Sequence, residues 1–146
     1  MRKGKKRVWI LIVLGALAVM AAIIYFAMAP GMREAMNLTM ANIDFSNLKD
    51  GTWTGEYKGT KDSIRNCKVE ATVQDGRVTA VRVLEGPLAK PGGETVKIRD
   101  TYTIGDLFGR VIQGQTLQVD VISGATITSK THLKAVENAL QSALKP

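Results

Sequence analysis

The chain has 146 residues, which leaves room for one globular domain and an anchor but hardly for two domains. Its net charge is +7, yet five of its 20 basic residues and none of its 13 acidic residues precede residue 8. The remainder therefore carries 15 basic against 13 acidic residues, a nearly balanced +2. It lacks the basic stripe interleaved with aromatic residues that is typical of nucleic-acid binding, so we expect no nucleic-acid partner.

The first predicted element is a single transmembrane helix at residues 8–29, an uninterrupted run of 22 residues without a charged side chain. At about 1.5 Å per residue such a helix spans roughly 33 Å, enough for the hydrocarbon core of a bilayer. The basic end, residues 1–7, is expected to stay cytoplasmic, which places residues 30–146 outside the cell membrane. The alternative is a signal peptide cleaved after Ala29, although the apolar run is longer than the usual signal segment. Either version exports the remainder of the chain.

Residues 30–49 are predicted to be a juxtamembrane stalk, because Met and Ala stand where a compact domain would have larger apolar side chains. A single extracytoplasmic domain is predicted at residues 50–146, and about 100 residues can bury an adequate core. The only cysteine, Cys67, cannot form an internal disulfide. It is predicted to be buried as a small apolar side chain, with a reactive thiol or an intermolecular bridge as the alternatives.

Three strands are predicted in the first half of this domain. Gly51–Tyr57 is rich in strand-forming residues. Apolar and polar residues alternate over residues 66–74, and a β-branched run follows at residues 77–84. Asp75-Gly76 lies between these two runs and indicates a tight hairpin turn.

Two helices are predicted in the second half, at Thr103–Gln113 and Ser129–Leu144, from apolar residues at helical spacing. A short strand is predicted between them at Leu117–Ile122, and Thr128 or Ser129 is expected to cap the last helix. The predicted fold is therefore α+β. It consists of a small antiparallel sheet packed by two helices and preceded by one N-terminal transmembrane helix.

The segment Ser123-Gly124-Ala125-Thr126 joins the predicted strand to the last helix. A small-residue turn before a helix is a recurrent phosphate site, because the first helical amides lack partners and the helix dipole favours an anion. Gly124 lets the backbone approach a ligand, and Ala125 leaves space beside the Thr126 hydroxyl. On these residues alone, an ordinary helix start is the stronger interpretation.

Asp120-x-x-Ser123-Gly124-Ala125-Thr126-x-Thr128 resembles the flavinylation motif of the FMN-binding domain family. That family includes the FMN-carrying subunits of the sodium-translocating NADH:quinone reductase and of the Rnf electron-transport complex. Asp50–Gly55, Asp75–Val78 and Ala135–Leu140 also resemble family segments, in the family's order and spacing. The resemblance covers about residues 50–144.

The resemblance implies that a flavin transferase cleaves FAD and joins the FMN phosphate to the Thr126 hydroxyl as a phosphoester. It gives Asp120 the acidic position that helps to define the transferase's target; the alternative is an ordinary strand-end acid. Ser123 is a candidate hydrogen-bond donor to the phosphate or a turn residue. Thr128 is the alternative acceptor by residue type, although its position favours helix capping.

Candidate contacts of the flavin ring are Trp53, Tyr57 and the loop at residues 85–95, with core packing as the alternative for the two aromatic residues. His132, the sole histidine, is predicted to lie at the surface. It has no partners at metal-ligand spacing, and the sequence shows no Ser-His-Asp or Cys-His set for hydrolysis.

The predicted function is that of a membrane-anchored electron carrier rather than a stand-alone enzyme. FMN on Thr126 would relay electrons between a membrane redox donor and an acceptor outside the cytoplasm. The expected partners are the lipid bilayer, a flavin transferase and membrane redox proteins. The chain is shorter than the complex subunits named above, so membership of either complex does not follow. The alternatives are a flavin-free extracytoplasmic binding or sensory module, and a domain that binds FMN noncovalently.

Overall fold

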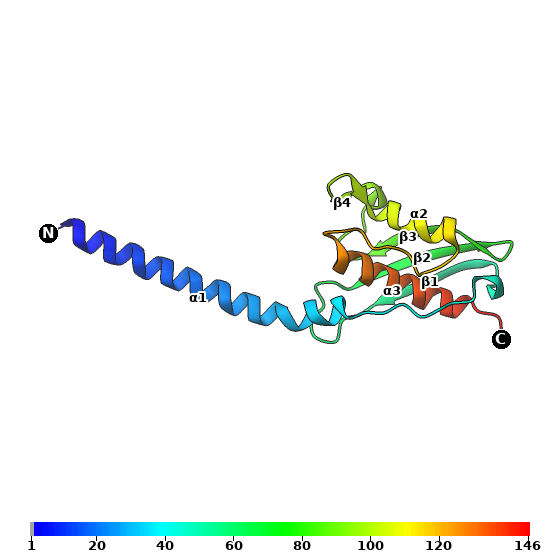
Figure 1. The fold of residues 1–146 in the computed structure, drawn as a ribbon, viewed down its shortest axis with the longest axis horizontal. Helices are drawn as coiled ribbons and strands as arrows, with labels where there is room; N and C mark the ends of the chain where they lie inside the picture. Colours follow the sequence, from blue (N-terminus) through cyan, green and yellow to red (C-terminus); the bar gives the residue numbers. More distant parts are fainter. Residues whose placement is uncertain (1) are drawn as a thin grey trace.

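The computed structural model describes residues 2–146, and their side chains from residue 4 onward. Helix α1 (Arg2–Met36) projects as one long rod away from the rest of the chain (Figure 1). Residues 4–27 of this helix are all exposed, including its large apolar side chains. The helix is long and apolar enough to cross a membrane, in line with the predicted N-terminal span.

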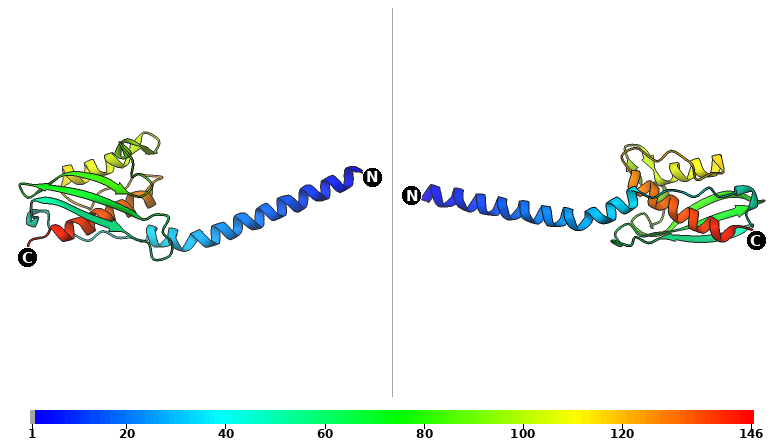
Figure 2. Two further views of the ribbon diagram at one scale, coloured as in Figure 1. Left: turned by 180° about the vertical axis from the view of Figure 1, so that it is seen from behind. Right: turned by 60° about the horizontal axis from the view of Figure 1, so that its bottom comes forward.

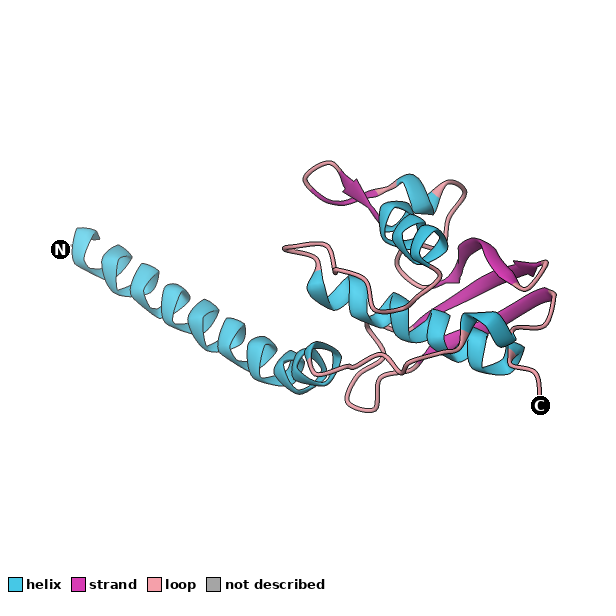
Figure 3. Cartoon of the chain, turned by 45° about the vertical axis from the view of Figure 1, so that its right-hand side comes forward, coloured by secondary structure: helices cyan, strands magenta, loops and turns pink. Residues whose placement is uncertain are grey.

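Strands β1 (Gly51–Tyr57), β2 (Cys67–Gln74) and β3 (Arg77–Glu85) form an antiparallel sheet in chain order (Figure 3). The predicted hairpin is confirmed, because Gln74 pairs with Arg77 across a two-residue turn. Both turn residues have positive φ, 51° at Asp75 and 70° at Gly76, which is the type I′ geometry that suits the twist of a hairpin.

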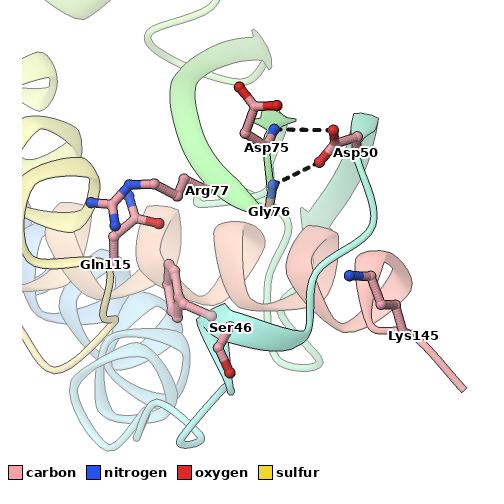
Figure 4. A pocket seen from close by; sticks show the side chains of 8 residues that line it. Ser46, Asp50, Asp75, Gly76, Arg77, Gln115 and Lys145 are labelled. Atoms are coloured by element: carbon pink, nitrogen blue, oxygen red, sulfur yellow. Dashed lines mark hydrogen bonds between the residues drawn. The ribbon is translucent and has the colours of Figure 1, made fainter.

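The start of β1 is held to this hairpin turn by one carboxylate. Asp50 accepts hydrogen bonds from the amides of Asp75 (3.0 Å) and Gly76 (2.8 Å), as Figure 4 shows. These residues line an open hollow of about 680 Å³ together with Gln115 and Lys145. Because Lys145 follows the C-terminal end of the last helix, this hollow lies at the opposite end of the domain from Thr126.

Two helices cover the sheet, so the predicted α+β fold is confirmed. Helix α3 (Thr126–Ala143) lies along β1 and β2, and α2 (Ile104–Gly114) contacts β3 (Figure 2). Helix α2 begins with a capping box, in which Thr103 accepts from the Asp106 amide and the Asp106 carboxylate accepts from the Thr103 amide. The short strands β4 (Lys97–Arg99) and β5 (Tyr102–Thr103) form a second, two-stranded sheet just before α2. The remaining elements are the 3₁₀ helices η1 (Phe45–Asn47) and η2 (Gly93–Thr95).

The prediction of a strand at Leu117–Ile122 is wrong. The segment pairs with no strand among the described residues. Its polar groups make hydrogen bonds that involve side chains instead. The Gln118 amide donates to the Thr116 hydroxyl (3.0 Å), and its side chain donates to the carbonyl of Met40 (3.1 Å). Leu117 and Ile122 are buried, so the apolar pattern reflects two anchor points in an extended connection rather than a sheet strand.

The segment between α1 and β1 runs against the domain. Leu48 is fully buried and pairs with Leu144 after α3. The Ala41 amide donates to the Glu137 carboxylate (2.8 Å), which is itself buried and accepts from Lys134 (2.7 Å). The residues predicted as a stalk therefore contact α3 along its length.

Candidate functional site

A hydrogen-bonded turn directly precedes α3. The amide of Ala125 donates to the carbonyl of Ile122 (2.9 Å), and Gly124 between them has a φ of 77°. Positive φ at the third residue alone is the type II arrangement, which favours glycine there. Ser123 and Gly124 are exposed, whereas Ile122 and Ala125 are buried. The ends of the turn are thus anchored in the core while its tip faces solvent.

Ser129 fixes this turn from inside the protein. Its hydroxyl, which is fully buried, donates to the carbonyl of Ala125 (2.8 Å) and accepts from the amide of Ile122 (3.2 Å). The prediction that Thr128 or Ser129 caps the helix is wrong, because α3 already begins at Thr126. Ser129 instead ties the first helical turn to the segment before it.

Thr126 is the first residue of α3 and is half-buried. The first helical hydrogen bond runs from the Ser129 amide to the Ala125 carbonyl (2.9 Å), so the three amides at residues 126–128 have no partner within the helix. Ala125 provides no side-chain cap. These amides and the positive end of the helix dipole are therefore available to an anion beside the Thr126 hydroxyl.

Arg99, from β4, lies directly on this turn. A Cβ placed on Gly124 would stand 2.7 Å from Arg99 Nε and 3.0 Å from its Cδ, so a larger residue would push the arginine side chain away from the turn. The Arg99 side chain is 56% exposed, and its Nε is 3.7 Å from the carboxylate of Asp100. A positive charge thus stands at the solvent side of the turn. Sequence reasoning missed Arg99, which no motif links to Thr126.

Asp120, shortly before the turn, is in contact with Arg110 of α2. Arg110 donates to the main-chain carbonyl of Asp120 (2.5 Å), whereas the Asp120 carboxylate is exposed. The Arg110 guanidinium also lies 5.8 Å from the centre of the Tyr102 ring, which is 46% exposed. The exposed carboxylate of Asp120 is accessible to a partner protein, as a recognition role would require.

The two aromatic candidates for ring contact lie on β1. Tyr57 is buried, and the half-buried Trp53 donates its ring N–H to the Lys49 carbonyl (3.0 Å). They share the face of β1 on which Gly55 meets α3, so both occupy the interface between sheet and helix. Their positions fit the alternative to flavin contact, which is that both side chains pack in the core.

Cys67 is buried, as predicted. It is 3% exposed, and its thiol donates to the Thr131 carbonyl (3.6 Å). Burial raises the pKa of Cys67 to about 12. The thiolate is therefore scarce at neutral pH, which argues against the reactive-thiol alternative.

His132 is buried, so the prediction of a surface position is wrong. The residue is 2% exposed, and its ring lies 6.4 Å, centre to centre, from the ring of Phe108 in α2. Nδ1 is 2.8 Å from the Thr128 carbonyl, which can only accept, so Nδ1 carries the proton. Nε2 has no hydrogen-bond partner among the described residues. The apolar spacing in α3 indicates only one buried face, whereas Phe108 of α2 packs beside His132 on another.

Acid is expected to destabilise the domain through His132. Burial lowers the pKa of the folded His132, so the unfolded chain takes up a proton first, near pH 6.5. Stability should be complete above that pH and fall below it, by at most about 1.4 kcal/mol per pH unit. Denaturant unfolding of the full chain in detergent micelles, at neutral pH and near pH 5.5, measures how the free energy of unfolding changes with pH. His132→Leu should abolish this pH dependence. The same pH dependence in the variant and in the unchanged protein would show that another group is responsible.

Comparison with known proteins identifies the family. The model of the FMN-binding domain matches residues 65–141, more than half of the chain, from just before β2 through most of α3. The chain belongs to the FMN-binding domain family. The matched range contains the whole turn before α3 and Thr126, and it confirms the family to which the motif pointed. No curated protein and no solved structure matches the chain.

The residues around Thr126 fit the phosphate end of FMN. The start of α3 is uncapped, the tip of the turn is exposed, and Arg99 supplies a cation across Gly124. Unpaired helix amides and an arginine are the usual protein partners of a phosphate. This end of α3 therefore offers the partners that an anionic group such as a phosphate needs.

Proposed function

We propose that this domain carries FMN covalently, as a phosphoester on the Thr126 hydroxyl. The observation that carries the proposal is the position of Thr126, which is the first residue of an uncapped helix directly behind an exposed turn. The hydroxyl makes no hydrogen bond to any described residue, so no internal bond must break before it reacts. The family match over residues 65–141 supports FMN as the ligand.

The proposed attachment requires a flavin transferase that uses FAD as the donor. The Thr126 oxygen attacks the phosphorus of the FMN half, the pyrophosphate P–O bond breaks, AMP leaves and the hydroxyl proton is released. The protein gains the mass of FMN less one water. The resulting phosphodiester keeps one negative charge, which the free amides of α3 and the Arg99 guanidinium stabilise.

The bound flavin would make the protein an electron carrier at the membrane. FMN supplies the redox chemistry when bound, while the chain provides attachment and orientation. With residues 2–7 cytoplasmic and α1 across the bilayer, the domain lies outside, where a covalent bond prevents loss of the cofactor. The proposed partners are a membrane redox donor and an extracytoplasmic acceptor.

Intact mass spectrometry tests the attachment. The full chain is coexpressed with an active flavin transferase, denatured and weighed, and we expect a single adduct of FMN less one water. The adduct should be absent without the transferase. Noncovalent FMN binding would leave flavin in the native protein but no adduct after denaturation. An unmodified chain beside a control substrate that the same transferase does modify would refute the proposal.

Arg99→Gln is expected to slow flavin attachment about fivefold, which corresponds to ~1 kcal/mol for one exposed charge-assisted hydrogen bond. The reason is the lost cation beside Gly124, where the phosphate must pass. Initial rates of adduct formation with purified transferase and FAD measure the effect. Lys97→Gln, which removes an exposed charge from the same strand, is the matched control and should react as fast as the unchanged protein. Equal rates in both variants would assign Arg99 no role in attachment.

A further inference from the structure

Helix α1 is joined firmly to the domain by its last turns. The Glu34 carboxylate accepts hydrogen bonds from the amides of Thr60 (2.9 and 3.1 Å) and Lys61 (3.1 Å), in the loop between β1 and β2. Gly31 is buried at the same place, and a Cβ added there would overlap the carboxylate of Asp62. The backbone of α1 at Gly31 therefore lies directly against the Asp62 side chain of this loop, residues 58–66.

This joint lies beside the end of the predicted transmembrane span. The predicted transmembrane span ends at Ala29, and Gly31 is only two residues further, about 3 Å along the helix axis. The headgroup region on each side of a bilayer is roughly 5–7 Å deep. Met28 and Ala29 are already half-buried by the protein, whereas residues 4–27 are exposed. With α1 across the bilayer, the loop that touches Gly31 must lie at headgroup depth.

The same loop presents an apolar side chain that is largely exposed to solvent. Ile64 is 56% exposed, more than Leu84 (39%) or Tyr102 (46%) elsewhere in the domain. Its position is held, because the Asp62 carboxylate accepts from the Ile64 amide (3.1 Å) and from the Arg65 guanidinium (2.9 Å). A fixed isoleucine that faces solvent is costly in water and favourable at a lipid surface.

A basic residue stands beside this isoleucine. Lys61 is exposed, and its amine has no salt bridge among the described residues. The carboxylate of Asp62, its nearest acid in the chain, is already paired with Arg65 at 2.9 Å. The loop thus combines an apolar side chain with an exposed lysine, as interfacial membrane segments do.

We propose that the loop between β1 and β2 is a membrane-contacting surface, with Ile64 inserted at the boundary of the acyl chains and Lys61 among the lipid phosphates. The domain then rests on the bilayer at two adjoining points, α1 and this loop. Lys130, one turn after Thr126, donates to the Met36 carbonyl at the end of α1 (2.5 Å). The N-terminal end of α3 therefore lies on the membrane side of the domain (Figure 1). This inference depends on α1 spanning the membrane and not on flavin attachment.

Lipid-dependent quenching of a site-specific fluorophore tests the contact. The full chain carrying Ile64→Cys is labelled with a polarity-sensitive dye and reconstituted into phosphatidylcholine vesicles that contain spin-labelled lipid in both leaflets. Cys67 is buried and should not label. Gln74→Cys, exposed at the far hairpin, is the matched control, and Leu17→Cys in the middle of α1 verifies the span.

We expect lipid quenching at position 64 to be several-fold stronger than at position 74, with an emission shift to shorter wavelength. Position 17 should be quenched strongly in every preparation. Equal quenching at positions 64 and 74 would overturn the contact. Quenching at 64 that requires added phosphatidylglycerol would also overturn the insertion of Ile64, because it would assign the contact to charge attraction alone. An unquenched position 17 would remove the membrane span on which the inference rests.

Discussion

Replacing Thr126 with alanine is expected to eliminate the covalent flavin while the fold is retained. The change removes the hydroxyl that we propose as the nucleophile at the start of α3. It should cost little stability, because the Thr126 side chain is half-buried and makes no hydrogen bond to any described residue. Intact mass after coexpression with a flavin transferase measures the adduct, and flavin fluorescence of the denatured chain provides a second readout. Circular dichroism checks that the variant is folded.

Two neighbouring substitutions make this experiment specific. Thr126→Ser keeps the hydroxyl in place and should retain the adduct. Thr128→Ala should also retain it, because the described contacts of Thr128 use its carbonyl, which His132 (2.8 Å) and Thr131 (3.1 Å) approach. An adduct that survives in Thr126→Ala, or one that disappears only in Thr128→Ala, would move the attachment site to another residue.

Replacing Gly55 with valine is expected to damage the fold more than any other single change considered. Gly55 is buried in β1, and a Cβ there would overlap the amide of Ala139 and the carbonyl of Ala135 in α3. These are backbone atoms that cannot rotate away, so the helix as a whole must move off the sheet. Overpacking of a core commonly costs 1–3 kcal/mol, and we expect a loss of about 3 kcal/mol or more here, out of a total of about 5–15 kcal/mol.

Denaturant unfolding of the full chain in detergent micelles, followed by near-ultraviolet circular dichroism, measures this loss. The matched control is Thr54→Val, which adds a similar side chain at the next residue of β1 but on the exposed face. It should be near neutral, because a β-branched residue suits a strand and meets no helix there. If the Gly55 variant unfolds at the same denaturant concentration as the control, close packing of α3 on β1 does not limit stability.

The elements that were predicted correctly depend on neighbours in the chain. The alternation in β2, the Asp75-Gly76 turn and the β-branched run of β3 each specify their structure within a few residues. Helix α2 likewise shows its start in sequence, because Thr103 and Asp106 form a capping box. In such segments the local preference and the tertiary fold agree, so no distant contact is needed to predict them.

The predictions that failed involve distant contacts. Leu117 and Ile122 look like strand residues, but the sheet is completed by three other strands and leaves this segment extended and unpaired. The sequence predicts the start of α3 three residues late, because the Ser129 hydroxyl accepts a hydrogen bond from the Ile122 amide (3.2 Å) instead of capping the helix. The sequence predicts His132 at the surface, because no neighbouring residue in the chain indicates that Phe108 of α2 packs beside it.

By itself, the sequence determined the apolar helix, the strands of the hairpin, the family and Thr126 as the proposed attachment residue. These features reside in runs of adjacent residues, whose hydrophobicity, periodicity and motif chemistry are readable without coordinates. Only the tertiary structure brought Arg99 onto Gly124 and set the loop with Ile64 beside Gly31, in the last turns of α1. Those pairs are separated by tens of residues, and they meet because the whole core packs in one way.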